Sequence, residues 1–325
     1  MTLTNAELVE GAKHDELLQR IDALCADHEW DALIDLKELC REAVKRGKQL
    51  WAVAHHVDYR LALEGPPAVA GPVVDSPASR FTLGPLTEVA ASTHTWAELA
   101  PHLPLGPSRS VVAQERVVRG EDLRDAPDLD STLLEVPLVL ADWEPKYSVP
   151  EYKSDRLESH PPHPERLDEV GLRPGEPIND RASVDALLGL VSTWTESSNG
   201  TAEAKVVEGT ALHAIGSLGL RDARVAVLDP SQAMAIMAWT AADGGAFGQR
   251  SGAANGRLVA WWTAATITDL ADEWPVDPAF LGEAIAELRW YWWSDLYPAT
   301  GWACRLAIED PQANYAWVLN AADAK

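Results

Sequence analysis

The feature that most constrains the fold is the helical spacing of apolar side chains in the first 120 residues. Between residues 14 and 30 this spacing places one apolar face on Leu17, Leu18, Ile21, Leu24 and Cys25. The same pattern recurs along residues 30–47 and 48–64, so residues 5–64 are predicted to form three helices. Two more helices are predicted at residues 86–103 and 108–123. Their short connections favour antiparallel neighbours, as in a helical bundle or a short helical-hairpin array.

The next segment has a different composition. Residues 121–169 contain 14 acidic residues, 5 Lys or Arg, and seven prolines. Proline is tolerated in edge strands but not in central ones, so residues 133–145 are predicted to form at most one edge strand. The sequence therefore predicts a helical domain at 1–120, an acidic, proline-rich connection at 121–180, and a further domain at 181–325.

The last part of the chain is rich in tryptophan, since ten of the 14 Trp residues follow residue 190. Helices are predicted at residues 180–197, 229–245 and 277–296, the last two opening with an Asp-Pro pair that favours a helix start. Residues 223–228 are typical of a short strand, and alternating apolar residues after 302 indicate a hairpin that turns at Asp310 and Pro311. The expected fold is mainly α, with a Trp-rich second helical block, a few short strands and a possible C-terminal β-hairpin.

Residues 244–257, GGAFGQRSGAANGR, look at first like a phosphate-binding loop. A phosphate loop of the Gly-x4-Gly-Lys type needs a lysine, and no lysine occurs between Lys205 and Lys325. A dinucleotide-binding fingerprint needs Gly-x-Gly-x-x-Gly after a strand, whereas here the spacing differs and a predicted helix precedes. Neither type of phosphate site is supported.

Small residues recur every four positions from this segment onward. The row comprises Gly248, Gly252, Gly256, Ala260 and Ala264. Rows at this spacing form grooves on a helix surface, into which a second helix can pack closely. We therefore expect a helix that packs against the one predicted at 229–245.

Two arginines in the same region leave a functional alternative open. Arg250 and Arg257 could hold a carboxylate or phosphate, with Trp261 and Trp262 as walls of the pocket. His94, in a polar stretch of a predicted helix, would be the acid–base group of such a site. The competing interpretation pairs both arginines with some of the 50 acidic residues of the chain.

No metal site or cofactor is predicted. His55 and His56 lie on one predicted helix, where solvated or hydrogen-bonded histidines are expected rather than a metal site. Residues 160–165, HPPHPE, are more typical of a rigid loop.

The net charge of −23 disfavours nucleic acid and anionic membrane surfaces, because both need a basic counter-surface. The sequence has no membrane-spanning run and no signal peptide, and three cysteines without metal-type spacing favour a cytoplasmic location. The helical-hairpin organisation, the lack of a catalytic constellation, the acidic surface and the proline-rich connection, as a docking segment, favour a non-enzymatic interaction or scaffold protein. Its partner is expected to be a protein, and the acidic surface favours a basic one. The alternative is a small-ligand-binding protein or enzyme that acts on an anionic compound through Arg250 and Arg257 near Trp261.

Overall fold

The computed structural model describes residues 3–76, 79, 81–127, 129, 133–296 and 300–324. The chain forms two compact units. The first unit comprises Met1–Arg116, Pro127–Asp130 and Pro150–Glu158, and the second comprises Val117–Ala126, Ser131–Val149 and Ser159–Lys325. The segment 121–180 thus contributes residues to both units, and its role as a separate connection stays a prediction.

The first unit is built from helices that pack largely on their neighbours in the chain. They are α1 (Asn5–Glu10), α2 (His14–Ala26), α3 (Trp30–Lys45), α4 (Trp51–Glu64), α5 (Pro67–Val73), α6 (Leu86–Thr93), α7 (Trp96–Leu99), the 3-10 helix η1 (Ala100–His102) and most of α8 (Pro107–Val118). A short ribbon of β1 (Glu151–Tyr152) and β2 (Leu157–Glu158) completes the unit. Helix α3 ends just before Gly47, whose φ of 92° is accessible to glycine at little cost.

Two details differ from the helices predicted for this unit. Residues 5–64 contain four helices, because Thr4 and Glu7 form a capping box that starts the short α1. The single helix predicted at 86–103 is interrupted at His94, because Thr95 and Glu98 form a second capping box that starts α7.

The second unit is organised around an antiparallel sheet of six strands in the order β3-β5-β6-β7-β8-β4. The strands are β3 (Asp168–Gly171), β4 (Thr201–Glu208), β5 (Asp222–Leu228), β6 (Arg289–Ser294), β7 (Trp302–Asp310) and β8 (Tyr315–Asp323). The hairpin of β7 and β8, which turns after Asp310, and the strand at 223–228 confirm two of the sequence predictions.

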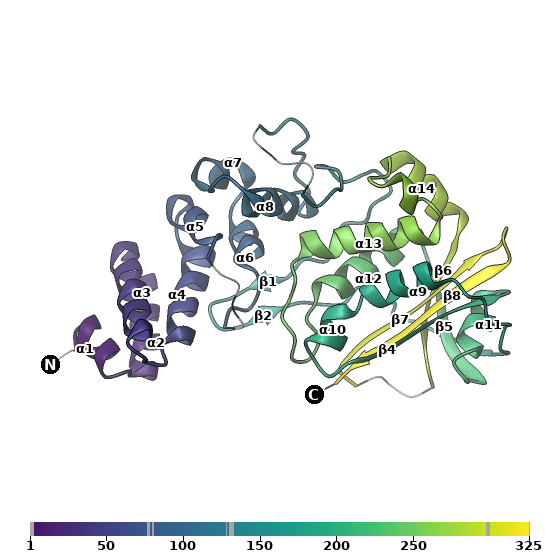
Figure 1. Cartoon of the computed structure of the whole chain (residues 1–325), viewed down its shortest axis with the longest axis horizontal. Coiled ribbons are helices and arrows are strands. Elements are labelled where there is room, and N and C mark those ends of the chain that lie inside the picture. The colour runs from purple at the N-terminus through teal and green to yellow at the C-terminus, as the bar shows by residue number, and fades with distance from the viewer. Residues whose placement is uncertain are drawn as a thin grey trace. The chain divides into compact units, whose positions relative to one another are not determined.

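Helices cover both faces of this sheet (Figure 1). One face packs under α9 (Arg181–Gly189), α12 (Pro230–Ala242) and α13 (Ala253–Ile267), and the other face packs under α11 (Ala211–Gly216). Side chains alternate between the two layers: Trp290 and Trp292 belong to the larger core, and Trp293 belongs to the core under α11. The remaining elements are α10 (Ser192–Glu196), the 3-10 helix η2 (Ala271–Glu273) and α14 (Pro278–Glu287).

The second unit contains more strand than the few short strands that the sequence predicts. The helix predicted at 277–296 ends at Glu287, and the aromatic run that follows is strand β6 in the middle of the sheet. Within the described residues of 133–145 no strand forms. Helices make up 46% of the chain and strands 15%, so the fold is mixed but mainly helical, as predicted. Among the described residues, no helix is both long and apolar enough to cross a membrane.

Candidate functional site

Arg257 lies at the centre of a polar network in the second unit. Its Nε and Nη2 atoms donate to the two carboxylate oxygens of Glu144, each at 2.8 Å. Its Nη1 donates to the carbonyl of Pro137 at 2.7 Å, and Nη2 also donates to the carbonyl of Val139 at 3.0 Å. The side chains of Arg257 and Glu144 are both 0% exposed. This two-pronged pair fixes residues 137–144 on helix α13.

Glu144 has further donors besides Arg257. Its Oε1 accepts hydrogen bonds from the Trp261 indole at 2.8 Å and from the Tyr147 hydroxyl at 2.6 Å, and its Oε2 accepts the Ala141 N–H at 2.8 Å. Burial by itself would raise the pKa of Glu144, but the Arg257 guanidinium and the hydrogen bonds outweigh it and lower that pKa. An anionic ligand at Arg257 would therefore have to displace a buried, multiply bonded carboxylate.

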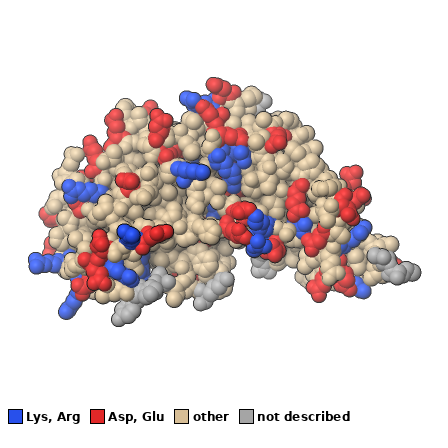
Figure 2. Space-filling model, turned by 180° about the vertical axis from the view of Figure 1, so that it is seen from behind, with Lys and Arg blue, Asp and Glu red and all other residues tan. Residues whose placement is uncertain are grey.

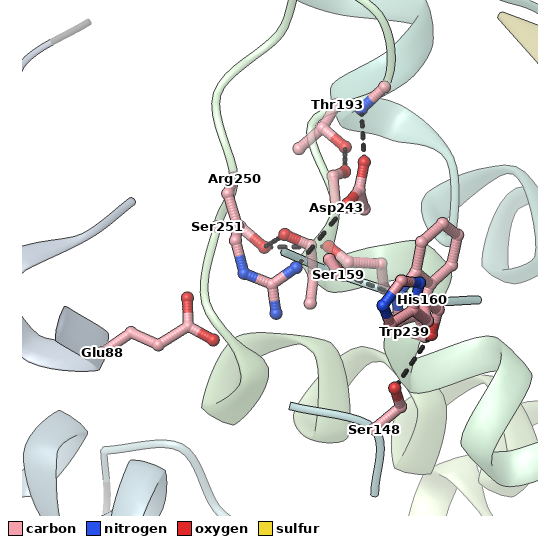
Figure 3. A network of polar contacts seen from close by, with 12 residues as sticks. Glu88, Ser148, Ser159, His160, Thr193, Trp239, Asp243, Arg250 and Ser251 are labelled. Atoms are coloured by element: carbon pink, nitrogen blue, oxygen red, sulfur yellow. Dashed lines mark hydrogen bonds and ion pairs between the residues drawn. The ribbon is translucent and has the colours of Figure 1, made fainter. Parts of the chain in front are cut away.

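Arg250 is also placed against a carboxylate, as Figure 3 shows. Its Nη1 lies 3.7 Å from Oδ2 of Asp243, and only 3% of the Arg250 side chain is exposed. Asp243 is itself held in place: its carbonyl accepts the Thr193 hydroxyl at 2.8 Å and the Trp194 indole at 3.0 Å. The two arginines thus each face an acid, Asp243 for Arg250 and Glu144 for Arg257.

The loop between α12 and α13 uses its backbone N–H groups within the protein. The Ala246 N–H donates to Asp323 Oδ2 at 2.7 Å, the Phe247 N–H donates to Ser198 Oγ at 3.0 Å, and the Ser251 N–H donates to the Ala242 carbonyl at 2.9 Å. A phosphate cradle would instead direct such groups toward the ligand. This glycine-rich segment is therefore a connecting loop that is held in place by hydrogen bonds to other parts of the protein.

The row of small residues is only partly helical, which corrects the sequence prediction. Helix α13 begins at Ala253, so Gly248 and Gly252 precede it, and Gly252 is its N-cap residue with a φ of 98°. Gly256, by contrast, lies in α13 directly against α12: a Cβ atom there would be 2.2 Å from the carbonyl oxygen of Ala238. The residues Ala260 and Ala264 continue this buried face of α13.

The three remaining predicted site residues lie in different surroundings. Trp261 is buried, with the Arg257 guanidinium 5.5 Å from its ring, whereas the neighbouring Trp262 is 42% exposed and lines a separate cavity. His94 belongs to the first unit, where its Nδ1 lies 3.1 Å from the Ala90 carbonyl and its Nε2 lies 3.0 Å from the Gly65 carbonyl. These contacts give His94 the role of a cap for the last turn of α6 and the end of α4.

The first unit contains an open groove that the sequence does not predict. This cavity of about 520 Å³ is lined by His14, Leu18, Asp22, Ala52, Val53, His56, Phe81, Ser154 and Asp155. Two of its apolar side chains remain unusually open to solvent: Leu18 is 40% and Phe81 is 41% exposed. We call this cavity the helical groove. The residues that line the groove come from segments far apart in the chain. Leu18 has the helical spacing of a core residue, so the sequence gives no signal that it lines a groove.

Two carboxylates border the helical groove. The side chains of Asp22 and Asp155 are 66% and 73% exposed, and their recorded ion pairs are with Arg60 and Arg156. Burial lowers the pKa of His56, which favours the uncharged form of this ring. The groove therefore combines apolar contacts with two solvent-accessible acids.

Comparison with protein families covers almost the whole chain. Residues 15–325 match the profile of a family described as a family of unknown function, DUF6183. The chain belongs to this family. No curated protein and no solved structure matches it. Because the match spans both units, the helical array and the sheet belong together in the family.

A second cavity of the first unit carries the opposite charge. It measures about 480 Å³ and is lined by Arg41, Lys45, Trp51, His55, Pro72, Asp75 and Ser76. Its cations are paired: Arg41 with the buried Asp58 at 2.9 Å, and Lys45 with Glu42 at 2.6 Å. On the face shown in Figure 2, basic side chains are likewise interspersed with acidic ones. Among the described residues, no three His, Cys, Asp or Glu side chains are grouped so that they could hold a metal ion.

Proposed function

We propose that this protein is a non-enzymatic interaction or scaffold protein whose helical groove binds a positively charged segment of a partner protein. The observation that carries the proposal is the combination of Leu18 and Phe81, both substantially exposed, with the carboxylates of Asp22 and Asp155 in one cavity. A bound segment would insert an apolar side chain between Leu18 and Phe81 and place Lys or Arg beside the acids. The three free, buried cysteines support a reducing compartment such as the cytoplasm.

The size and charge of the groove support this choice of partner. A cavity of about 520 Å³ can accept one or two side chains of a peptide but not a folded domain. The net charge of −23 also favours encounter with a cationic partner. The geometry gives less support to the alternative of an anionic ligand, since Arg250 and Arg257 each face a carboxylate.

The proposal is tested with fluorescence anisotropy of labelled peptides. One set carries Leu or Phe flanked by Lys and Arg, and a matched set replaces each cation with Asp or Glu. We expect the cationic set to bind and the acidic set not to bind, with an affinity that falls as salt is added. Equal binding of both sets, or none by the cationic set, would contradict the proposal.

Two pairs of variants connect the binding to the groove. Phe81→Ala is compared with Leu105→Ala, which removes an 82% exposed side chain of the same unit away from the groove. Asp155→Asn is compared with Asp35→Asn, an exposed acid on α3 outside the groove. The groove variants should weaken binding about fivefold or more, which corresponds to roughly 1 kcal/mol, and the control variants should not. Equal effects of a groove variant and its control would exclude this groove as the binding site.

A further inference from the structure

The second unit contains an aromatic corner formed by two tryptophans. The rings of Trp262 on α13 and Trp274, which follows η2, meet nearly at right angles, with centroids 5.2 Å apart and planes at 78°. Trp262 is 42% exposed although it lies in a helix that is otherwise largely buried. This partly exposed indole is therefore accessible to a ligand.

The two indoles line one cavity of about 340 Å³ with four other residues. These are Leu134, Glu135, Leu258 and Val259. The walls are therefore apolar and aromatic, and Glu135 is the one lining residue with a charged side chain. The volume suits a compact group with little need for hydrogen bonds.

Glu135 is positioned at the tryptophans by its local backbone. Its Oε2 accepts a hydrogen bond from the Trp274 indole at 2.6 Å. The preceding residue, Leu134, has a φ of 53°, which is uncommon for a residue other than glycine, and its carbonyl accepts the Val136 N–H in a tight turn around Glu135. Backbone conformations of this kind tend to occur where a side chain must be held in a specific place.

The chemistry of this corner matches one class of ligand. The face of an indole attracts cations more strongly than any other aromatic side chain does, and a nearby carboxylate supplies the counter-charge. A quaternary ammonium has no N–H to satisfy, so its methyl groups can pack on the indoles and on Leu258 without leaving a donor unpaired. A sugar would need several hydrogen-bonding side chains, and this lining has only the carboxylate, which already accepts the Trp274 N–H.

We propose that the corner of Trp262, Trp274 and Glu135 binds a quaternary or N-methylated ammonium group. The group can belong to a small molecule such as choline or to a trimethylated lysine of a protein, since the recognised chemistry is the same. This site lies in the second unit and does not depend on the proposed function of the helical groove.

The first test compares choline with 3,3-dimethyl-1-butanol, in which carbon replaces the charged nitrogen. Binding is followed by NMR through the indole N–H signals of Trp262 and Trp274, assigned with the variants Trp262→Phe and Trp274→Phe. Sodium chloride at matched concentrations controls for ionic strength. We expect choline and tetramethylammonium to shift both signals with dissociation constants in the millimolar range or tighter, and the neutral analogue to bind about tenfold more weakly. Equal binding of choline and its neutral analogue, or no shift with either cation, would overturn the proposal.

Two further measurements identify the ligand source and the residues. The affinity of a peptide with trimethyl-lysine is compared with that of the same peptide carrying unmodified lysine, and with the affinity of choline. If the trimethyl-lysine peptide binds more tightly than choline does, the ligand is assigned to a protein. Trp262→Ala should abolish the response, and Glu135→Gln should weaken it about threefold to tenfold. The comparison of charged and neutral analogues is made on the wild-type protein, so a loss of stability in Trp262→Ala would leave that test intact. An unchanged response in a folded Trp262→Ala protein would exclude this corner.

Discussion

Arg257 and Glu144 form an ion pair that is completely excluded from solvent and joins residues 113 positions apart in the chain. The pair brings the proline-rich segment before Val149 onto helix α13, and the Trp261 indole and the Tyr147 hydroxyl complete the coordination of the carboxylate. Buried ion pairs of this kind contribute little net stability over an apolar replacement, but the loss of one partner leaves a buried charge. The pair therefore ties the fold of this segment to α13.

We predict that Arg257→Met destabilises the protein by about 3–5 kcal/mol, because Glu144 would remain buried without its cation. The measurement is the free energy of unfolding in urea. The control is Arg181→Ala, which removes the exposed Arg181–Asp185 pair on α9 and should cost less than about 1 kcal/mol. A cost for Arg257→Met no larger than that of the control would contradict the role of the pair. The double variant with Glu144→Gln should recover part of the loss.

Gly256→Ala is expected to destabilise the contact between α12 and α13, since the added Cβ would meet the Ala238 carbonyl at 2.2 Å. The expected cost is about 1–3 kcal/mol in the free energy of unfolding. Gly189 is a matched control: it ends α9, and a Cβ atom there has no neighbour within 4 Å among the described residues. Gly189→Ala should be neutral or stabilise by up to about 1 kcal/mol. Similar effects of the two substitutions would refute close helix packing at Gly256.

The helices of the first unit could be predicted from the sequence because their apolar spacing and glycine stops are local signals. The six-stranded sheet could not be predicted to the same extent. Residues 277–292 begin with an Asp-Pro helix start and continue largely apolar, so the pattern does not reveal the transition to strand β6 after Glu287. Only the alternation of Trp290 and Trp292 against Trp293, with the β preference of aromatic residues, signals a strand.

The candidate sites depended on long-range contacts that no local pattern reveals. The abundance of acidic residues made ion pairs for Arg250 and Arg257 the expected alternative, but nothing in the sequence singled out Glu144 or Asp243 as the partners. The helical groove and the aromatic corner both combine residues from distant segments. Both sites are recognised by large apolar side chains that are exposed to solvent. Sequence periodicity alone predicts such side chains to be buried in the core.

His163 gives a prediction for pH dependence. Its ring stacks on Trp292 with centroids 4.0 Å apart, and burial lowers its pKa from 6.5 to about 4. The folded protein therefore favours the neutral ring, so the stability that His163 contributes is complete above about pH 6.5 and is lost as the pH falls toward 4. His163→Phe should keep the stacking and reduce the loss of stability between about pH 7 and pH 5 by on the order of 1–2 kcal/mol. An identical pH profile of the variant and the wild type, measured by thermal unfolding, would contradict this assignment.

The three cysteines provide a probe of each unit separately. Burial raises the pKa of Cys25 and Cys40 to about 11 and that of Cys304 to about 12, and all three side chains are buried. Since the thiolate is the reactive form, we expect no reaction with a thiol reagent in the folded protein near neutral pH. In increasing denaturant, Cys25 and Cys40 should become reactive together, because both belong to the first unit, while Cys304 reports on the second. Mass spectrometry of the labelled protein identifies each site. Rapid labelling without denaturant, or different midpoints for Cys25 and Cys40, would show that the first unit does not protect these thiols as one cooperative structure.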